Sequence, residues 1–305
     1  MSISSAIAVP LPSSQASRSI ARRIFDRAVS TPGFRIGLAI FLILAIAVAL
    51  YPELSGIDPT KMDVRARLLP PLFLGDKWSW AHPLGTDQIG RDMLVRSLVG
   101  LRYSFLIGIC SVAVTLAIGC ALGMIAGYFG GRVDMLIMRL TDAQLSIPMI
   151  ILAIAVLGVS RPTIPAIILV LGLSNWPVYA RTMRSVAMTE RQREYVLAAK
   201  LGGSTDLRII VGLLLPLLLP PVIFSSVLDV ARMMIFESIL GFLGLGVQPP
   251  TPTFGNIIAD GRKYLLNAWW IATMPGIFLG LTLTSINLMG ASLERARNTI
   301  HGGSE

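Results

Sequence analysis

Three ionisable side chains lie within or just beyond an apolar stretch that begins near residue 209: Asp229, Arg232 and Glu237. At membrane depth such groups usually face a cavity or a partner, because exposure to lipid is costly. Asp229 and Arg232 are three positions apart, so on a helix they share a face and can neutralise each other. All three are therefore candidates for lining a path through a membrane, with an ordinary structural ion pair as the alternative for Asp229 and Arg232.

The other reactive residue types do not form a catalytic set. A membrane enzyme needs a nucleophile with a base, paired carboxylates or metal ligands near one surface. The two histidines, His82 and His301, are far apart in sequence, and both cysteines, Cys110 and Cys120, lie in one apolar stretch. We therefore expect no catalytic residues, no metal site, no disulfide framework and no cofactor. No Gly-Lys pair occurs, so the chain has no nucleotide-binding P-loop, and any ATP would have to be bound by another chain.

The composition indicates a polytopic membrane protein. Of 305 residues, 54% are hydrophobic and only 14% are charged, and the mean hydropathy is +0.71. Residues 103–131 and 264–293 contain no Asp, Glu, Lys or Arg, and each stretch exceeds the roughly 20 residues that cross a bilayer core. The net charge of +9 is explained by topology signals in cytoplasmic loops. No basic run with interleaved aromatics indicates nucleic-acid binding.

The elements that position these residues are expected to be helices throughout. Hydropathy predicts six transmembrane helices over residues 36–51, 105–127, 144–160, 163–180, 209–228 and 269–291, the fifth of which could continue to 240. The third and fourth are separated by Ser160, Arg161 and Pro162, which predicts a helical hairpin. The prediction is an all-α membrane protein.

The distribution of basic residues predicts the orientation. Five arginines precede the first span and three basic residues follow it, which places the N-terminus inside. Six spans then bring the C-terminus inside as well. The loop at about 182–208, which has more basic than acidic residues, becomes cytoplasmic. The first 33 residues also fit a mitochondrial transit peptide, although a cytoplasmic tail is the favoured interpretation.

That loop carries the clearest local pattern. Residues 189–202 read TERQREYVLAAKLG, with Tyr195, Leu197, Ala198 and Leu201 at helical spacing. Gly202-Gly203 predicts the helix stop. A second helix is expected to start near Asp206, with Ser204 or Thr205 as its N-cap, and to enter the membrane. The pattern suits a helix that docks into another protein, and a solvated connector is the alternative.

Two further segments are open to more than one interpretation. Asp87, Arg91 and Asp92 precede the second span, and the leucines that follow predict a helix on the outer membrane surface, serving as a gate or as an anchor. The second span also contains regularly placed glycines: Gly108, Gly119, Gly123 and Gly127. Their small side chains predict close helix packing, in which Cys110 and Cys120 are packing residues.

The docking loop resembles the EAA loop of ABC importer permeases. The resemblance rests on Ala198-Ala199, then Gly203, then Leu213-x-Leu215-Pro216. It implies that a coupling helix from Glu190 to Gly203 sits in an ATPase subunit. Leu197 stands where the family pattern has a glutamate, and Glu194 is one turn earlier. The implied coupling residues are Glu190, Glu194, Leu197, Ala198, Ala199, Gly203, Leu213, Leu215 and Pro216.

Other segments resemble the dipeptide/oligopeptide/nickel branch of these permeases, and in particular its C-type subunit. They read HPLGTD at 82–87, GRD at 90–92, GYFGGRVD at 127–134 and FLGLGVQPP at 242–250. Residues 289–293, MGASL, depart from the branch, which usually has an acidic residue after Leu-Gly. The resemblance implies a MetI-like ABC importer permease fold and a place in the bacterial cytoplasmic (inner) membrane.

The resemblance also implies partners and a substrate class. These are a different second permease subunit, cytoplasmic P-loop ATPases and an extracytoplasmic substrate-binding protein, with di- or oligopeptides as substrate. Nickel or another small solute is an alternative within the branch. A secondary transporter is the alternative from another class, although no internal repeat is visible. The expected divisions are a tail at 1–35, a first helix with its external segment at 36–104, a core permease domain at 105–292 and a second tail at 293–305.

Overall fold

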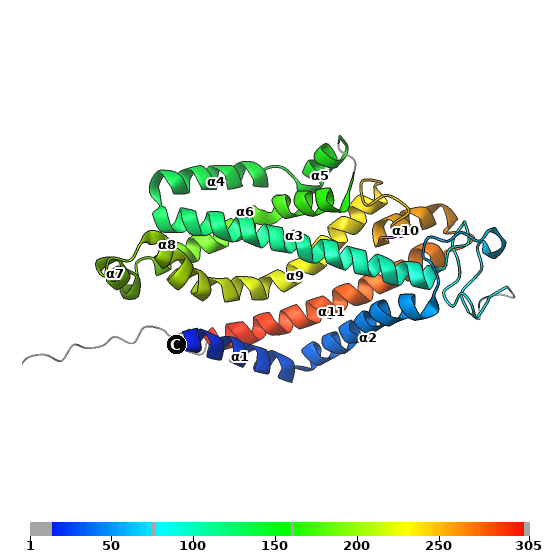
Figure 1. Cartoon of the computed structure of the whole chain (residues 1–305), viewed down its shortest axis with the longest axis horizontal. Helices are drawn as coiled ribbons and strands as arrows, with labels where there is room; N and C mark the ends of the chain where they lie inside the picture. The colour runs from blue at the N-terminus through cyan, green and yellow to red at the C-terminus, as the bar shows by residue number, and fades with distance from the viewer. Residues whose placement is uncertain (1–13, 73, 75–76, 160–161, 302–305) are drawn as a thin grey trace, which may run out of the picture.

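The computed structural model describes residues 14–72, 74, 77–159 and 162–301. This part of the chain is a bundle of long helices without a named strand (Figure 1). The long loop before α3 and the short helix α10 lie at one end of the bundle, whereas α1 and α7 lie at the other. The principal helices are α1 Ser14–Ser30, α2 Pro32–Ser55, α3 Met93–Phe129, α4 Gly131–Leu145, α5 Met149–Leu157, α6 Ile164–Glu190, α7 Glu194–Leu201, α9 Leu215–Phe242, α10 Phe254–Gly261 and α11 Trp270–His301.

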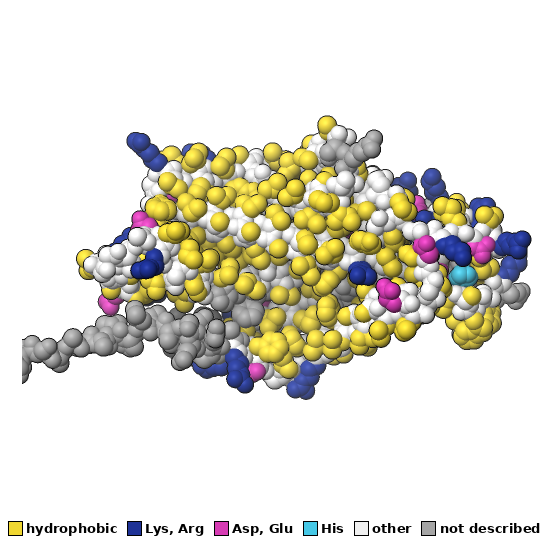
Figure 2. Space-filling model, viewed as in Figure 1, with side chains coloured by type: hydrophobic (Ala, Val, Ile, Leu, Met, Phe, Trp, Pro, Cys, Tyr) yellow, Lys and Arg dark blue, Asp and Glu magenta, His cyan; other side chains and the backbone are white. Residues whose placement is uncertain are grey.

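In this part of the chain, four helices and one bent pair of helices are long and apolar enough to cross a bilayer. Four helices are individually long and apolar enough: α2, α3, α6 and α11. The pair α4 and α5 meets the same test together. Helix α9 lies at the fifth predicted span, and its 28 residues contain no charged side chain before Asp229. Figure 2 shows hydrophobic side chains over the middle of the visible face, with most charged side chains toward the two ends.

The third span differs from its predicted form. The sequence predicted one helix over 144–160, but α4 and α5 meet at a break with an angle of 83°. Pro148 stands at this break in an extended conformation before α5, and proline cannot donate the backbone hydrogen bond that would continue α4. Residues 160 and 161 of the predicted hairpin turn lie outside the described residues.

The prediction of a separate interfacial helix before the second span is also wrong. A single 37-residue helix, α3, begins at Met93, and Asp92 caps it by accepting a hydrogen bond from the Val95 amide at 2.8 Å. Leu98 and Leu101 are buried within the protein instead of facing a membrane surface. Hydropathy could not show this, because Arg96 and Ser97 in the first turns of α3 are polar residues that are buried within the protein.

The predicted close packing at the glycines of α3 is confirmed: Gly119, Gly123 and Gly127 fit against α6, and Gly108 fits against α9. A Cβ atom at Gly119 would lie 2.6 Å from the Tyr179 Cβ, and one at Gly127 would lie 2.6 Å from the Arg184 carbonyl oxygen. At Gly123 it would overlap the carbonyl oxygen of Ala180 and lie 2.9 Å from the carbonyl carbon. Cys120 is buried in the same cluster, where it is a packing residue.

We expect Gly123→Ala to destabilise the folded chain by about 1–3 kcal/mol, the usual cost of overpacking a tight contact. The added methyl group meets backbone atoms of α6, which cannot rotate away as a side chain could. The thermal midpoint of the purified protein measures the effect. The matched control is Gly280→Ala in α11, where a Cβ meets nothing within 4 Å. Equal midpoints for the two variants would contradict the close α3–α6 contact.

Candidate functional site

The segment between α6 and α9 forms a compact projection at one end of the bundle (Figure 1). Helix α7 is followed by the short α8, Asp206–Ile209, and by a π-helical turn, Ile210–Leu214, that leads into α9. Val196 of α7 is buried, whereas Leu197, Leu201 and Leu207 are exposed. Leu201 is 90% exposed. Large exposed apolar side chains gathered on one projection indicate a surface for another protein.

The turn after α7 requires a glycine. Gly203 has φ +80°, the left-handed region that residues with a Cβ rarely adopt. Its amide donates to the Lys200 carbonyl at 3.0 Å, and the Ser204 amide donates to the Ala199 carbonyl at 3.0 Å. These bonds satisfy carbonyl groups at the end of α7. Thr205 then caps α8 by accepting from the Arg208 amide, which confirms the predicted second helix start.

The projection is braced against the end of α3. The Tyr128 hydroxyl donates to Asp206 Oδ1 at 2.6 Å, and Arg191 Nη1 donates to the Tyr128 carbonyl at 3.0 Å. The Lys200 ammonium lies 4.8 Å from the centroid of the Tyr128 ring. Tyr128 therefore contacts residues before, within and after α7, and these contacts tie α7 to the end of α3.

Helix α7 begins later than the sequence predicted. Glu190 is the last residue of α6, and α7 starts at Glu194. Glu190 Oε2 accepts a hydrogen bond from the Tyr195 hydroxyl at 2.8 Å. Burial, together with the Glu190 carboxylate, raises the pKa of Tyr195, so this hydroxyl stays protonated as a donor. Glu190 thus holds the α6–α7 corner, whereas Glu194 is exposed.

The remaining residues of the predicted coupling set divide by exposure. Leu197 and Ala198 are exposed on α7, and Ala199 is partly buried against the core. Leu213 and Leu215 pack against the same core cluster. Pro216 occupies the first turn of α9, directly after the π-helical turn. The structure therefore separates an outward face on α7 from residues that fix the entry of α9.

Asp229 and Arg232 form the ion pair that their spacing predicted. Arg232 Nη1 lies 2.8 Å from Asp229 Oδ1, and the Tyr179 hydroxyl of α6 donates to Asp229 Oδ2. The Asp229 side chain is only 11% exposed, whereas the Arg232 side chain is 57% exposed. Tyr179 and Asp229 therefore hold a guanidinium group that remains accessible on the surface of α9.

Glu237 lies apart from this pair. It is eight residues further along α9, about 12 Å along the helix axis. Its carboxyl is fully buried, and Oε2 accepts a hydrogen bond from the Ser104 hydroxyl of α3 at 2.7 Å. Oε1 has no hydrogen-bond partner among the described residues. The structure thus brings Asp229 and Arg232 together and places Glu237 in the α3–α9 contact.

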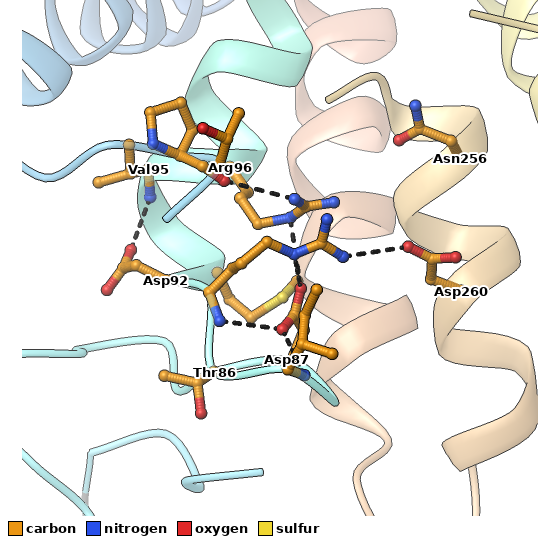
Figure 3. A network of polar contacts seen from close by, with 12 residues as sticks. Thr86, Asp87, Asp92, Val95, Arg96, Asn256 and Asp260 are labelled. Atoms are coloured by element: carbon orange, nitrogen blue, oxygen red, sulfur yellow. Dashed lines mark hydrogen bonds and ion pairs between the residues drawn. The ribbon is translucent and has the colours of Figure 1, made fainter. Parts of the chain in front are cut away.

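A charge network at the opposite end joins the segment between α2 and α3 to the bundle (Figure 3). Asp87 Oδ2 lies 2.5 Å from Arg91 Nε and 3.6 Å from Arg96 Nε. Arg91 also reaches Asp260 of α10, at 3.3 Å between Nη2 and Oδ2. The sequence analysis singled out Asp87 and Arg91 but missed Arg96 and Asp260. No local pattern could reveal Asp260, because it is 169 positions from Arg91.

Two further contacts hold the loop between α2 and α3 at the same end of the bundle. His82 Nδ1 lies 2.8 Å from Asp92 Oδ2, so the carboxylate that caps α3 also holds the loop between α2 and α3. The Trp270 indole donates to the Thr86 carbonyl at 3.1 Å. Among the described residues, no group of three or more His, Cys, Asp or Glu could hold a metal ion.

Long apolar helices and an exposed apolar projection are typical of a membrane-embedded protein that contacts another protein. The chain belongs to the family described as the inner membrane component of binding-protein-dependent transport systems, whose match spans residues 119–298. Membership places it with binding-protein-dependent transporters and not with the secondary transporters considered above.

Curated relatives extend the similarity over most of the chain. The di/tripeptide transport system permease protein DppC of Pseudomonas aeruginosa is 37% identical over 262 residues, 86% of both chains. The probable D,D-dipeptide permease DdpC of Escherichia coli K12 is 37% identical over 88% of each chain. The nickel permease NikC of the same organism is 34% identical over 85% of this chain and 91% of its own.

A solved structure shares the fold. It is an inward-facing form of the MetNI methionine ABC transporter, with a TM-score of 0.53 and 19% identity. The match covers 67% of this chain and 97% of the other. This likeness confirms the predicted MetI-like architecture.

Proposed function

We propose that this chain is the transmembrane permease subunit of an ATP-driven importer, and that it forms half of the translocation pathway for di- or oligopeptides. The observation that carries the proposal is the projection at α7, on which exposed Leu197 and Leu201 are braced to α3 and α6 through Tyr128 and Glu190. Such a surface suits a groove on a partner, and its bracing suits the transmission of rigid-body motion.

The proposed assembly follows from the family and from the sequence. A second, different permease subunit completes the pathway, and a substrate-binding protein delivers substrate from outside. Cytoplasmic P-loop ATPases dock on α7 and hydrolyse ATP, since this chain has no P-loop of its own. The α7 end is then cytoplasmic, with both termini, and the protein lies in the bacterial inner membrane.

We propose that Asp229 and Arg232 line the pathway. Arg232 is exposed near the middle of an apolar helix, where a charged group is stable only beside water or a partner. Asp229 and Tyr179 fix its position. Glu237 affects the same pathway indirectly, because its hydrogen bond with Ser104 joins the pathway helix α9 to α3.

We expect Glu237→Gln to lower substrate uptake while the complex stays assembled. The amide keeps the size of the side chain and can accept the Ser104 hydrogen bond, but it removes the ability to ionise. Initial uptake rates and co-purification of the ATPase, measured on the same preparation, test this. Loss of assembly, or uptake equal to that of the wild type, would contradict a role for Glu237 in transport.

Peptide is the proposed substrate because two of the relatives described above are named for di- or tripeptide transport. Nickel is the second candidate, because one relative is named as a nickel permease. Uptake of a labelled dipeptide and of nickel by proteoliposomes with the whole complex separates them. Dipeptide uptake that requires ATP and the binding protein is the expected result, whereas ATP-dependent nickel uptake alone would replace peptide with nickel.

A further inference from the structure

Helix α1 is fixed to the bundle at the end where α7 projects (Figure 1). Ile24 and Ala28 of α1 are buried against Leu293 and Ala296 of α11. Thr31 caps the start of α2, and Arg35 Nε donates to the Val29 carbonyl at 3.1 Å. One face of α1 is therefore occupied by the protein, which fixes the direction of the opposite face.

The opposite face is basic. Arg22, Arg23 and Arg27 are exposed on α1, and Arg35 is exposed in the first turn of α2. The only acidic residue among them is Asp26, whose Oδ2 lies 4.0 Å from Arg22 Nε with both side chains well exposed. Such an ion pair contributes little. Four arginines against one aspartate leave a local excess of positive charge.

This basic face continues into the exposed apolar surface of α2. Only 17% of the most apolar 18-residue stretch of α2 is buried, the lowest share among the four single-helix spans. Its exposed side chains include Ile36, Ile43, Ile46 and Leu50. Phe25 of α1 is also exposed, beside the arginines and with its ring edge-on to Phe34. The arginines thus lie where the apolar surface of α2 ends.

We propose that α1 and the first turn of α2 bind the anionic headgroups of phospholipids in the leaflet at the α7 end. Basic residues beside a membrane helix attract anionic lipid by about 1 kcal/mol each. An amphipathic helix at the interface places apolar side chains in the acyl region and cationic ones among the headgroups. The continuity of Phe25 and Ile36 with the α2 surface favours lipid over a protein partner.

The test uses the purified complex in mixed micelles with phosphatidylglycerol or phosphatidylcholine, and native mass spectrometry counts the lipids retained. The wild type is expected to retain phosphatidylglycerol preferentially. The triple variant Arg22→Gln, Arg23→Gln and Arg27→Gln should lose at least about tenfold in this retention, given three weakened charge contacts. The same three positions changed to Lys should retain it.

Two controls make the result specific. Changing Lys61, Arg65 and Lys263 to Gln removes three exposed charges at the opposite end and should leave the retention of phosphatidylglycerol unchanged. Recovery of the ATPase with the Gln variant shows that the chain is still inserted correctly. Equal retention by the wild type and the Gln variant would overturn the proposal, as would displacement of the lipid by inorganic phosphate. Neither result bears on whether the complex imports peptides.

Discussion

Asp87→Ala is expected to destabilise the end of the bundle opposite α7 by about 3–5 kcal/mol, the usual cost of removing one partner from a buried ion pair. Asp87 is the carboxylate that Arg91 and Arg96 share. The side chains of all three are at most 7% exposed. Without Asp87, Arg96 has no carboxylate in contact among the described residues, and Arg91 keeps only Asp260 at 3.3 Å. The thermal midpoint of the purified complex measures the loss.

A nearby aspartate supplies the control for this prediction. Asp58 is exposed, and its carboxylate accepts hydrogen bonds from the Thr60 amide at 2.7 Å and from the Thr60 hydroxyl at 2.6 Å. Asp58→Ala should therefore lower the midpoint far less than Asp87→Ala. Proteolysis of residues 56–92 should also become faster in the Asp87 variant, because this network joins the segment between α2 and α3 to α10. Equal midpoints would show that the network does not stabilise the fold.

Leu201→Glu is expected to weaken binding of the ATPase subunit by about 30-fold or more, which corresponds to an interface hot spot of about 2 kcal/mol. Leu201 is 90% exposed, so the substitution removes no internal contact and the fold should be unaffected. In the assembled complex, however, a carboxylate would be buried in an apolar contact without a partner. Uptake should fall in parallel, because α7 is the proposed mechanical link.

The control for Leu201 is Leu266, which is 99% exposed at the opposite end of the molecule. Leu266→Glu introduces the same charge and should leave ATPase binding unchanged. Binding is measured by titrating the purified ATPase against each permease variant in detergent. A Leu201→Glu variant that binds the ATPase as tightly as the wild type would contradict the assignment of α7 as the docking helix.

Hydropathy located the membrane helices well because each apolar stretch is long and most are bounded by polar residues. It placed helix ends poorly where polar residues pack inside the protein. Helix α3 begins twelve residues before its predicted start, since Asp92 caps it and Arg96 is buried in an ion pair. The bend between α4 and α5 was missed because Pro148 was read as part of a continuous apolar segment.

The candidate site could be predicted only where its contacts are local. The spacing of Asp229 and Arg232 was enough to predict their ion pair, and the Gly202-Gly203 pair was enough to predict the end of α7. Tyr179 could not be linked to Asp229 from the sequence, because the two residues are 50 positions apart on different helices. The same limit applies to Ser104 and Glu237, which are 133 positions apart.

The most direct test of the proposed function is to purify the tagged chain from its own membranes in mild detergent and identify the proteins that accompany it. The account predicts a second permease subunit and a P-loop ATPase, with ATP hydrolysis by the complex that depends on α7. Recovery of the chain alone, in a form that transports substrate under an ion gradient without ATP, would contradict it.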